Sequence, residues 1–233
     1  MKAVKRCGAI SLIAMLLCVQ LSSSTWAAGI ENVPNETNTS SESLEGFIDF
    51  VSPLYEGGEE FSAYEIKGIN GENLKEQMVA DTQDLADNGE WEEVREYCRR
   101  NLSAIEYTQT GKLLTRAGDI AKWGTKTIQR FNVPRVSGYN YSVNTTDVRF
   151  KISGTIYYDP NTKVISSVSS TTVTDQSSTN GTVGVVDTYS YHSNYTGTFK
   201  AIAHPKWDVY VGSIYQGTMV FDNVEGVLEV SPD

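Results

Sequence analysis

The residues in this chain that could do chemistry are a cysteine, two histidines and several adjacent carboxylates. Cys98 is the only cysteine outside the N-terminal segment that holds Cys7 and Cys18. A single thiol in an exported protein can be a nucleophile, pair between chains, or fill a core as a small apolar side chain. Cys98 falls in a helical apolar pattern, which favours the buried role. A hydrolase using Cys98 or a carboxylate pair is the less favoured alternative.

The two histidines lack the neighbours that catalysis or metal binding requires. Neither His192 nor His204 has a second His or Cys at a metal-ligand spacing. The sequence also has no HExxH, CxxC, GxSxG, P-loop or GxGxxG motif. Adjacent carboxylates such as Glu59-Glu60 lie in a segment so acidic that their adjacency is uninformative. We therefore expect a protein that is not an enzyme and uses no metal or cofactor.

Tyrosine offers an apolar ring with a polar tip, which suits recognition surfaces. Tyr157 precedes the turn Asp159-Pro160-Asn161 and has the parity of an exposed strand residue. We take Tyr157, Tyr158 and His192 as candidate ligand-binding residues. The expected partner is an extracellular protein or a glycan.

Three further tyrosines are predicted to be buried instead. Tyr189, Tyr191 and Tyr195 share parity with Val183 and Phe199, so all five would lie on the dry face of one hairpin.

The N-terminus has the pattern of a secretory signal peptide, residues 1–27. A basic start is followed by an apolar run from 9 to 21 and then by small residues before Ala27 and Ala28, where we expect cleavage. No second such run occurs, so no membrane span is expected after cleavage. The sequence predicts a secreted or cell-surface protein, and the lysine-rich signal favours a bacterial source.

Charge divides the remaining chain unevenly. The polar stretch 28–44 is predicted to be a disordered leader. Residues 28–110 contain 19 acidic and 5 basic residues, whereas residues 111–233 contain 10 acidic and 11 basic ones. A polyphosphate would be repelled by the first part and not attracted by the second, so nucleic acid binding is disfavoured.

Residues 45–110 are expected to form an acidic helical module. Apolar residues recur at intervals of three or four on both sides of Asn88-Gly89, a pair that can end a helix because glycine adopts positive φ easily. Acidic residues follow at the start of the second helix, where the helix dipole favours them. The pattern predicts a helical hairpin. A solvated domain is favoured over an inhibitory pro-segment.

From about residue 125 apolar residues recur at every second position, the pattern of a β-strand with one buried face. The clearest strand is 147–158, whose even-numbered residues are mostly apolar and whose odd-numbered ones are mostly polar. About eight such strands separated by turn signals predict an antiparallel β-sandwich over residues 111–233, with a β-barrel as the alternative. The expected fold class is therefore α+β.

The Ser/Thr-rich stretch 163–174 raises a second function. A spanning β-hairpin needs sustained alternation, but Val164 and Val168 have one parity and Ile165 and Val173 the other. This slip predicts a bulge or an edge strand with a wet face. The chain is thus expected to be an exported binding or interaction protein, and a pore-forming toxin is the alternative.

Overall fold

The structure is a computed structural model that describes residues 40–114, 120–138, 143–179 and 183–233. The expected signal peptide, residues 1–27, lies outside the described residues, as does most of the expected leader, 28–44. A helix begins at Ser40, inside that leader. Over the described ranges, no helix is both long enough and apolar enough to cross a bilayer.

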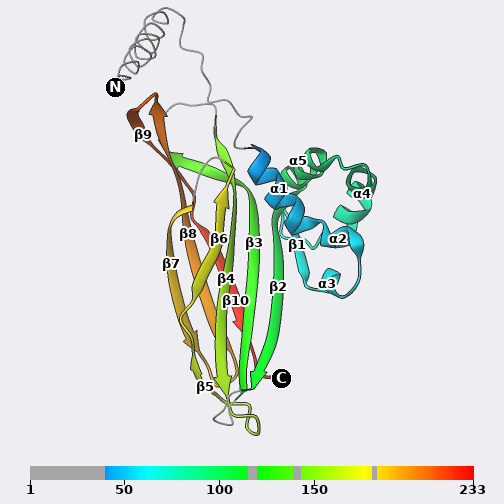
Figure 1. Cartoon of the computed structure of the whole chain (residues 1–233), viewed down its shortest axis with the longest axis vertical. Helices are drawn as coiled ribbons and strands as arrows, with labels where there is room; N and C mark the ends of the chain where they lie inside the picture. Colours follow the sequence, from blue (N-terminus) through cyan, green and yellow to red (C-terminus); the bar gives the residue numbers. More distant parts are fainter. Residues whose placement is uncertain (1–39, 115–119, 139–142, 180–182) are drawn as a thin grey trace, which may run out of the picture. The chain divides into compact units, whose positions relative to one another are not determined.

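The described chain is mostly antiparallel β-sheet, preceded and interrupted near its start by short helices (Figure 1). The helices are α1 (Ser40–Val51), α2 (Pro53–Glu56), α3 (Glu59–Ser62), α4 (Lys75–Asp87) and α5 (Trp91–Asn101). The strands are β1 (Tyr64–Gly68), β2 (Leu102–Leu114), β3 (Ile120–Ser137), β4 (Thr145–Tyr158), β5 (Ile165–Val168), β6 (Thr172–Ser178), β7 (Val183–His192), β8 (Gly197–Val211), β9 (Ile214–Phe221) and β10 (Val224–Val230).

The two helices predicted around Asn88-Gly89 are confirmed. Helix α4 ends at Asp87, and Gly89 has a φ of 75°, the left-handed conformation that only glycine adopts without strain. Helix α5 has acidic residues in its first turn and Arg99 and Arg100 in its last, so both ends match the helix dipole.

Two long strands organise the sheet. Strand β3 pairs with β2 and β4 along most of its length and with β9 at its end, from Arg135. Strand β8 pairs with β7 and β10 over its first half and with β9 over its second. Strands β5 and β6 both pair with β4, and β1 pairs with β2. Because β3 and β8 each change neighbours partway, the strands form one continuous sheet.

The sheet is open, so the barrel alternative is wrong. Closure would require the edge strands to pair with one another. Among the described strands, β1 pairs with β2 alone, while β7 and β10 each pair with β8 alone. The edges therefore stay unjoined.

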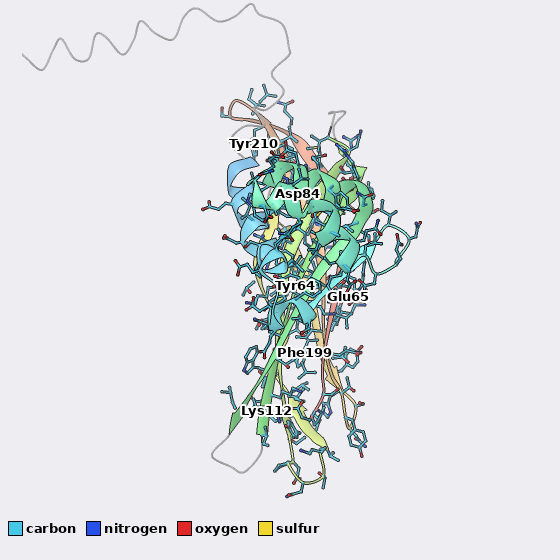
Figure 2. The ribbon with its side chains drawn as sticks, turned by 90° about the vertical axis from the view of Figure 1, so that its right-hand side faces the viewer. Tyr64, Glu65, Asp84, Lys112, Phe199 and Tyr210 are labelled. Carbon is cyan, nitrogen blue, oxygen red and sulfur yellow. The ribbon has the colours of Figure 1, made fainter. Side chains whose placement is uncertain are left out.

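One hydrophobic core, here called the sheet core, is built by inward-facing residues of β3, β4, β8, β9 and β10. The predicted alternation of β4 is confirmed, because Val148, Phe150, Ile152, Ile156 and Tyr158 are fully buried. Glycines let the strands approach closely. A side chain at Gly154 of β4 would clash with Phe199 of β8, which Figure 2 shows midway along the sheet.

A second core, here called the helix core, lies between the helices and β1, β2 and β3. Its buried side chains come from the helices and first strands, with Phe131 from β3. Cys98 lies in this core with no exposed surface, as its sequence pattern favoured. Strand β2 contributes Leu102 and Ile105 and runs through to Leu114. The expected boundary between residues 110 and 111 therefore falls inside a strand.

A buried ion pair joins α5 to β4. The Arg99 guanidinium donates to the Asp147 carboxylate at 2.8 Å, and the backbone N–H of Asn132 donates to the same carboxylate at 3.1 Å. Asp147 is only 5% exposed, so its charge is compensated by these donors rather than by water.

Candidate ligand-binding groove

The candidate site follows from the alternation of β4. Since its even-numbered residues fill the sheet core, Ser153, Thr155 and Tyr157 point to the opposite face. The register with β3 places Thr125 beside Ser153 and Trp123 beside Thr155. Hydroxyls and one indole thus gather on the outer face of β3 and β4.

The position of Trp123 depends on a glycine in the neighbouring strand. Gly111 of β2 is paired directly with Trp123, and a Cβ at Gly111 would lie only 2.5 Å from indole Cζ2. Contacts that short do not occur, so the indole can lie against β2 only because residue 111 has no side chain. Trp123 is consequently half-buried and held in place, with part of its surface left accessible.

The other wall of the groove is formed where β5 and β6 are interrupted. Ser169 takes the place of a regular ladder residue: its N–H donates to the Thr155 carbonyl at 2.8 Å, and its Oγ accepts the Thr155 N–H at 2.9 Å. The same Oγ donates to the Ser170 carbonyl at 3.0 Å. This break in the Ser/Thr-rich stretch accounts for the predicted slip of parity, and it adds serine hydroxyls to the groove.

Together these elements enclose a groove of about 380 Å³. Its lining residues are Trp123, Gly124, Thr125, Ser153, Gly154, Thr155, Ser169, Ser170 and Thr172. The volume is in the range of small-molecule sites, roughly 300–1,000 Å³. All nine residues are uncharged at any physiological pH. The groove therefore offers an aromatic surface and a set of hydroxyl donors and acceptors, but no acid, base or ion.

A second groove, of about 450 Å³, lies nearer the helices and differs in character. It is lined by Asp49 of α1 and by Arg149 and Lys151 of β4, among others. Arg149 donates to the Gly46 carbonyl, so part of its hydrogen-bonding capacity is used within the protein. Charges of both signs line this groove, which gives it no clear preference for one ligand charge.

The three predicted binding residues lie in different places. Tyr157 is 36% exposed and shares the outer face of β4 with Ser153 and Thr155, one step beyond the groove. Tyr158 is fully buried in the sheet core. His192 ends β7, is exposed, and contacts the Ser193 carbonyl through Nδ1 at 3.0 Å. The structure thus brings only Tyr157, of these three, to the face that carries the groove.

The prediction that Tyr189, Tyr191 and Tyr195 are buried is wrong, since they are 52%, 58% and 58% exposed. The pairing of β7 with β8 shifts between Val183 and Val185, which is a β-bulge. The extra residue reverses the faces after Val183, so Tyr189 and Tyr191 face solvent, whereas Tyr195 lies in the turn that follows β7.

Sequence reasoning missed Trp123 and the serines of the groove. Trp123 follows no motif, and its signal would have been the alternation of β3 together with an unexplained glycine at 111. Burial raises the pKa of the Cys98 thiol, so the nucleophilic thiolate is disfavoured. His204 contacts Asp187 and Asn223 on an outer strand surface.

Comparison of this chain with protein-family models, with curated proteins and with solved structures found no match in any of the three.

Proposed function

We propose that this chain is an exported, non-enzymatic binding protein whose groove over β3 and β4 takes a neutral glycan. The observation that carries the proposal is the lining of the groove: an indole held in position beside threonine and serine hydroxyls, with no charged group. A sugar presents an apolar face of C–H groups and a rim of hydroxyls. An aromatic ring matches the face, and hydroxyl side chains match the rim.

The surroundings support a ligand longer than one sugar. Tyr157 lies diagonally from Trp123 on paired strands, a relation that separates side chains by roughly 7–8 Å. Leu113, 58% exposed, is paired with Ala121, the residue paired with Tyr157 on the other side. The proposed binding face therefore continues from the groove toward this end of the sheet.

The proposed scaffold is a two-layer sandwich carrying an acidic helical module. Gly124 and Gly154 of β3 and β4 face Leu228 and Phe199 of β10 and β8, which supports two facing layers. In this arrangement the inner faces form the core and the outer face of one layer is free for recognition. Export rests on the signal-like segment 1–27.

The test is binding of a panel of neutral cello-, malto-, xylo- and chito-oligosaccharides, measured by isothermal titration calorimetry. We expect at least one to bind and Trp123→Ala to weaken it by about tenfold or more, equal to about 1.4 kcal/mol. Gly111→Val should weaken binding similarly, because it displaces the indole without removing it.

Tyr215→Ala is the matched control, since it removes an exposed aromatic ring (54% exposed) from a strand distant from the groove. It should leave binding unchanged. Absence of binding across the panel, or equal affinity of wild type and Trp123→Ala, would overturn the proposal. Melting temperatures of all variants show whether a loss reflects the groove or the fold.

A further inference from the structure

The hairpin between β8 and β9 ends in four exposed apolar side chains. Tyr210, Val211, Ile214 and Tyr215 are 57%, 60%, 67% and 54% exposed. Val211 is paired with Ile214 across a two-residue turn in which Gly212 has a φ of 62°. We call these four residues the apolar tip. Single exposed apolar residues are ordinary, but four gathered at one turn indicate an interaction site.

The tip is held rigidly by its own strands. The Tyr210 and Tyr215 rings pack edge to face with centroids 5.6 Å apart. The Tyr215 hydroxyl lies 2.6 Å from Thr218 Oγ1, which in turn donates to Asp208 at 2.5 Å. Further along β9, Met219 and Phe221 are buried in the sheet core. The apolar tip is therefore presented in a fixed conformation, so little conformational entropy is lost on docking.

The shape and size of the tip favour a lipid surface over a protein partner. A tight turn is convex, whereas a stable protein interface needs about 800 Å² on each side. Four half-exposed side chains supply on the order of 400 Å², since a buried aromatic residue contributes roughly 150–250 Å². Tyrosine is also the residue that, with tryptophan, is enriched where a bilayer meets water.

The charges of the hairpin and of the whole chain indicate which lipid headgroups the apolar tip would bind. The sequence from Val209 to Gly217 contains no charged residue, and the nearest flanking charges, Lys206 and Asp208, have opposite signs. The whole chain carries a net charge of −10. An anionic bilayer would repel it, while a zwitterionic one would not.

We propose that the apolar tip docks this protein shallowly into zwitterionic bilayers. Interfacial side chains bury about 5–10 Å into the boundary between headgroups and acyl chains, so the hairpin strands stay outside the hydrocarbon. Figure 2 shows Tyr210 and Lys112 at opposite ends of the sheet. The groove extends from Gly154, against Phe199 midway along the sheet, to Trp123, which is paired with Gly111 beside Lys112, so it would lie in the half of the sheet remote from the docked bilayer.

The test places a reporter at the turn of the form that begins after the expected cleavage at Ala27. Ser213→Cys is labelled with an environment-sensitive fluorophore in this form, where the remaining cysteine, Cys98, is buried and does not react. With phosphatidylcholine vesicles we expect a blue shift and a rise in emission. Phosphatidylglycerol in the vesicles should reduce both. The same label at Leu113→Cys, an exposed apolar position at the other end, should show neither.

Adding Val211→Asp and Ile214→Asp should abolish the response at position 213, because each change replaces an apolar side chain that favours burial by a charge whose desolvation costs free energy. Both residues are exposed, so the substitutions leave the cores intact. The proposal is overturned by an unchanged emission with vesicles, by an equal response at position 113, or by a response that survives the two aspartates. A concentration-dependent shift without vesicles would assign the tip to a second copy of the chain instead.

Discussion

The helix core and the sheet core are held together in different ways. The helix core pairs its buried hydroxyls: Tyr64 donates to the Phe50 carbonyl at 2.7 Å and Thr82 to the Met78 carbonyl at 2.6 Å. The sheet core is aliphatic and aromatic, and its buried Tyr158 hydroxyl has no hydrogen-bond partner among the residues that the structure describes. The first relies on specific polar geometry as well as area, whereas the second relies on close apolar packing around glycines.

The two cores are nevertheless coupled through β3. Ile128 belongs to the sheet core and Phe131, three residues later, to the helix core. Next to them, Asn132 has a positive φ of 52° and the register with β4 shifts. The described residues, from Ser40 to Asp233, belong to one compact unit. The two cores therefore differ in chemistry, but we expect them to unfold together because they share strand β3.

The largest expected loss in the free energy of unfolding comes from a substitution in the sheet core. Phe199→Ala removes a fully buried ring and should reduce the free energy of unfolding by about 3–5 kcal/mol. Met78→Ala, the corresponding change in the helix core, should cost about 2–5 kcal/mol. Urea unfolding is followed by circular dichroism for the helices and, in a Trp26→Phe/Trp91→Phe background, by the fluorescence of Trp123 and Trp207 for the sheet. Both variants should give coincident transitions.

A helical signal lost well before the fluorescence signal in Met78→Ala, with the sheet intact, would contradict the coupling. The cores would then be separate folding units.

The next effect concerns the ion pair that joins the cores. Asp147→Asn removes the buried carboxylate that accepts from Arg99, while Arg99 keeps its ion pair with Glu96 at 2.6 Å, and we expect a loss of about 2–3 kcal/mol in the free energy of unfolding. This is below the roughly 3–5 kcal/mol of a fully buried pair because the Arg99 side chain is 23% exposed. Chemical denaturation checks the value. Asp187→Asn is the matched control, because the Asp187 side chain is 54% exposed and pairs with His204, which is a cation only when protonated.

The smallest effect is a pH dependence at that control site. Hydrogen bonds to Asp187 and then to Asn223, opposed by slight burial, raise the pKa of His204 above its usual value near 6.5. A raised pKa in the folded state stabilises the protein fully below about pH 6.5, and this stabilisation is lost as pH rises through the folded pKa.

Wild type should therefore exceed Asp187→Asn in stability by less than about 1 kcal/mol near pH 5.5, and the difference should be smaller at pH 8. Melting temperatures at both pH values measure it. A difference that grows with pH would refute the assigned direction of the shift.

Local patterns predicted the elements that follow a single period. Strand β4 was readable because every second residue faces one core, and the α4–α5 turn because Asn88-Gly89 ends a helix. Strands β1 and β2 were missed, since β1 is short and β2 begins directly where α5 ends. Tyr189 was misplaced because one bulge reverses every later face of its strand, and alternation alone does not reveal a bulge.

The candidate groove could not be predicted from local sequence patterns, for a different reason. It is assembled from β2, β3, β4 and the break after β5, and the pairing of Gly111 with Trp123 exists only once their register is known. Tyr157 could be found from its parity beside a turn. The sequence contains no signal that sets the register among these strands.

Strand β4 has a consequence for how this protein could change over evolutionary time. Its even-numbered residues fill the sheet core, while Ser153, Thr155 and Tyr157 face outward. Substitutions at these three positions would alter the proposed recognition surface without touching the interior. Selection for a new ligand and selection for a folded chain therefore act on separate codons of one strand. A library randomised at the three positions would vary ligand specificity while the scaffold stays unchanged.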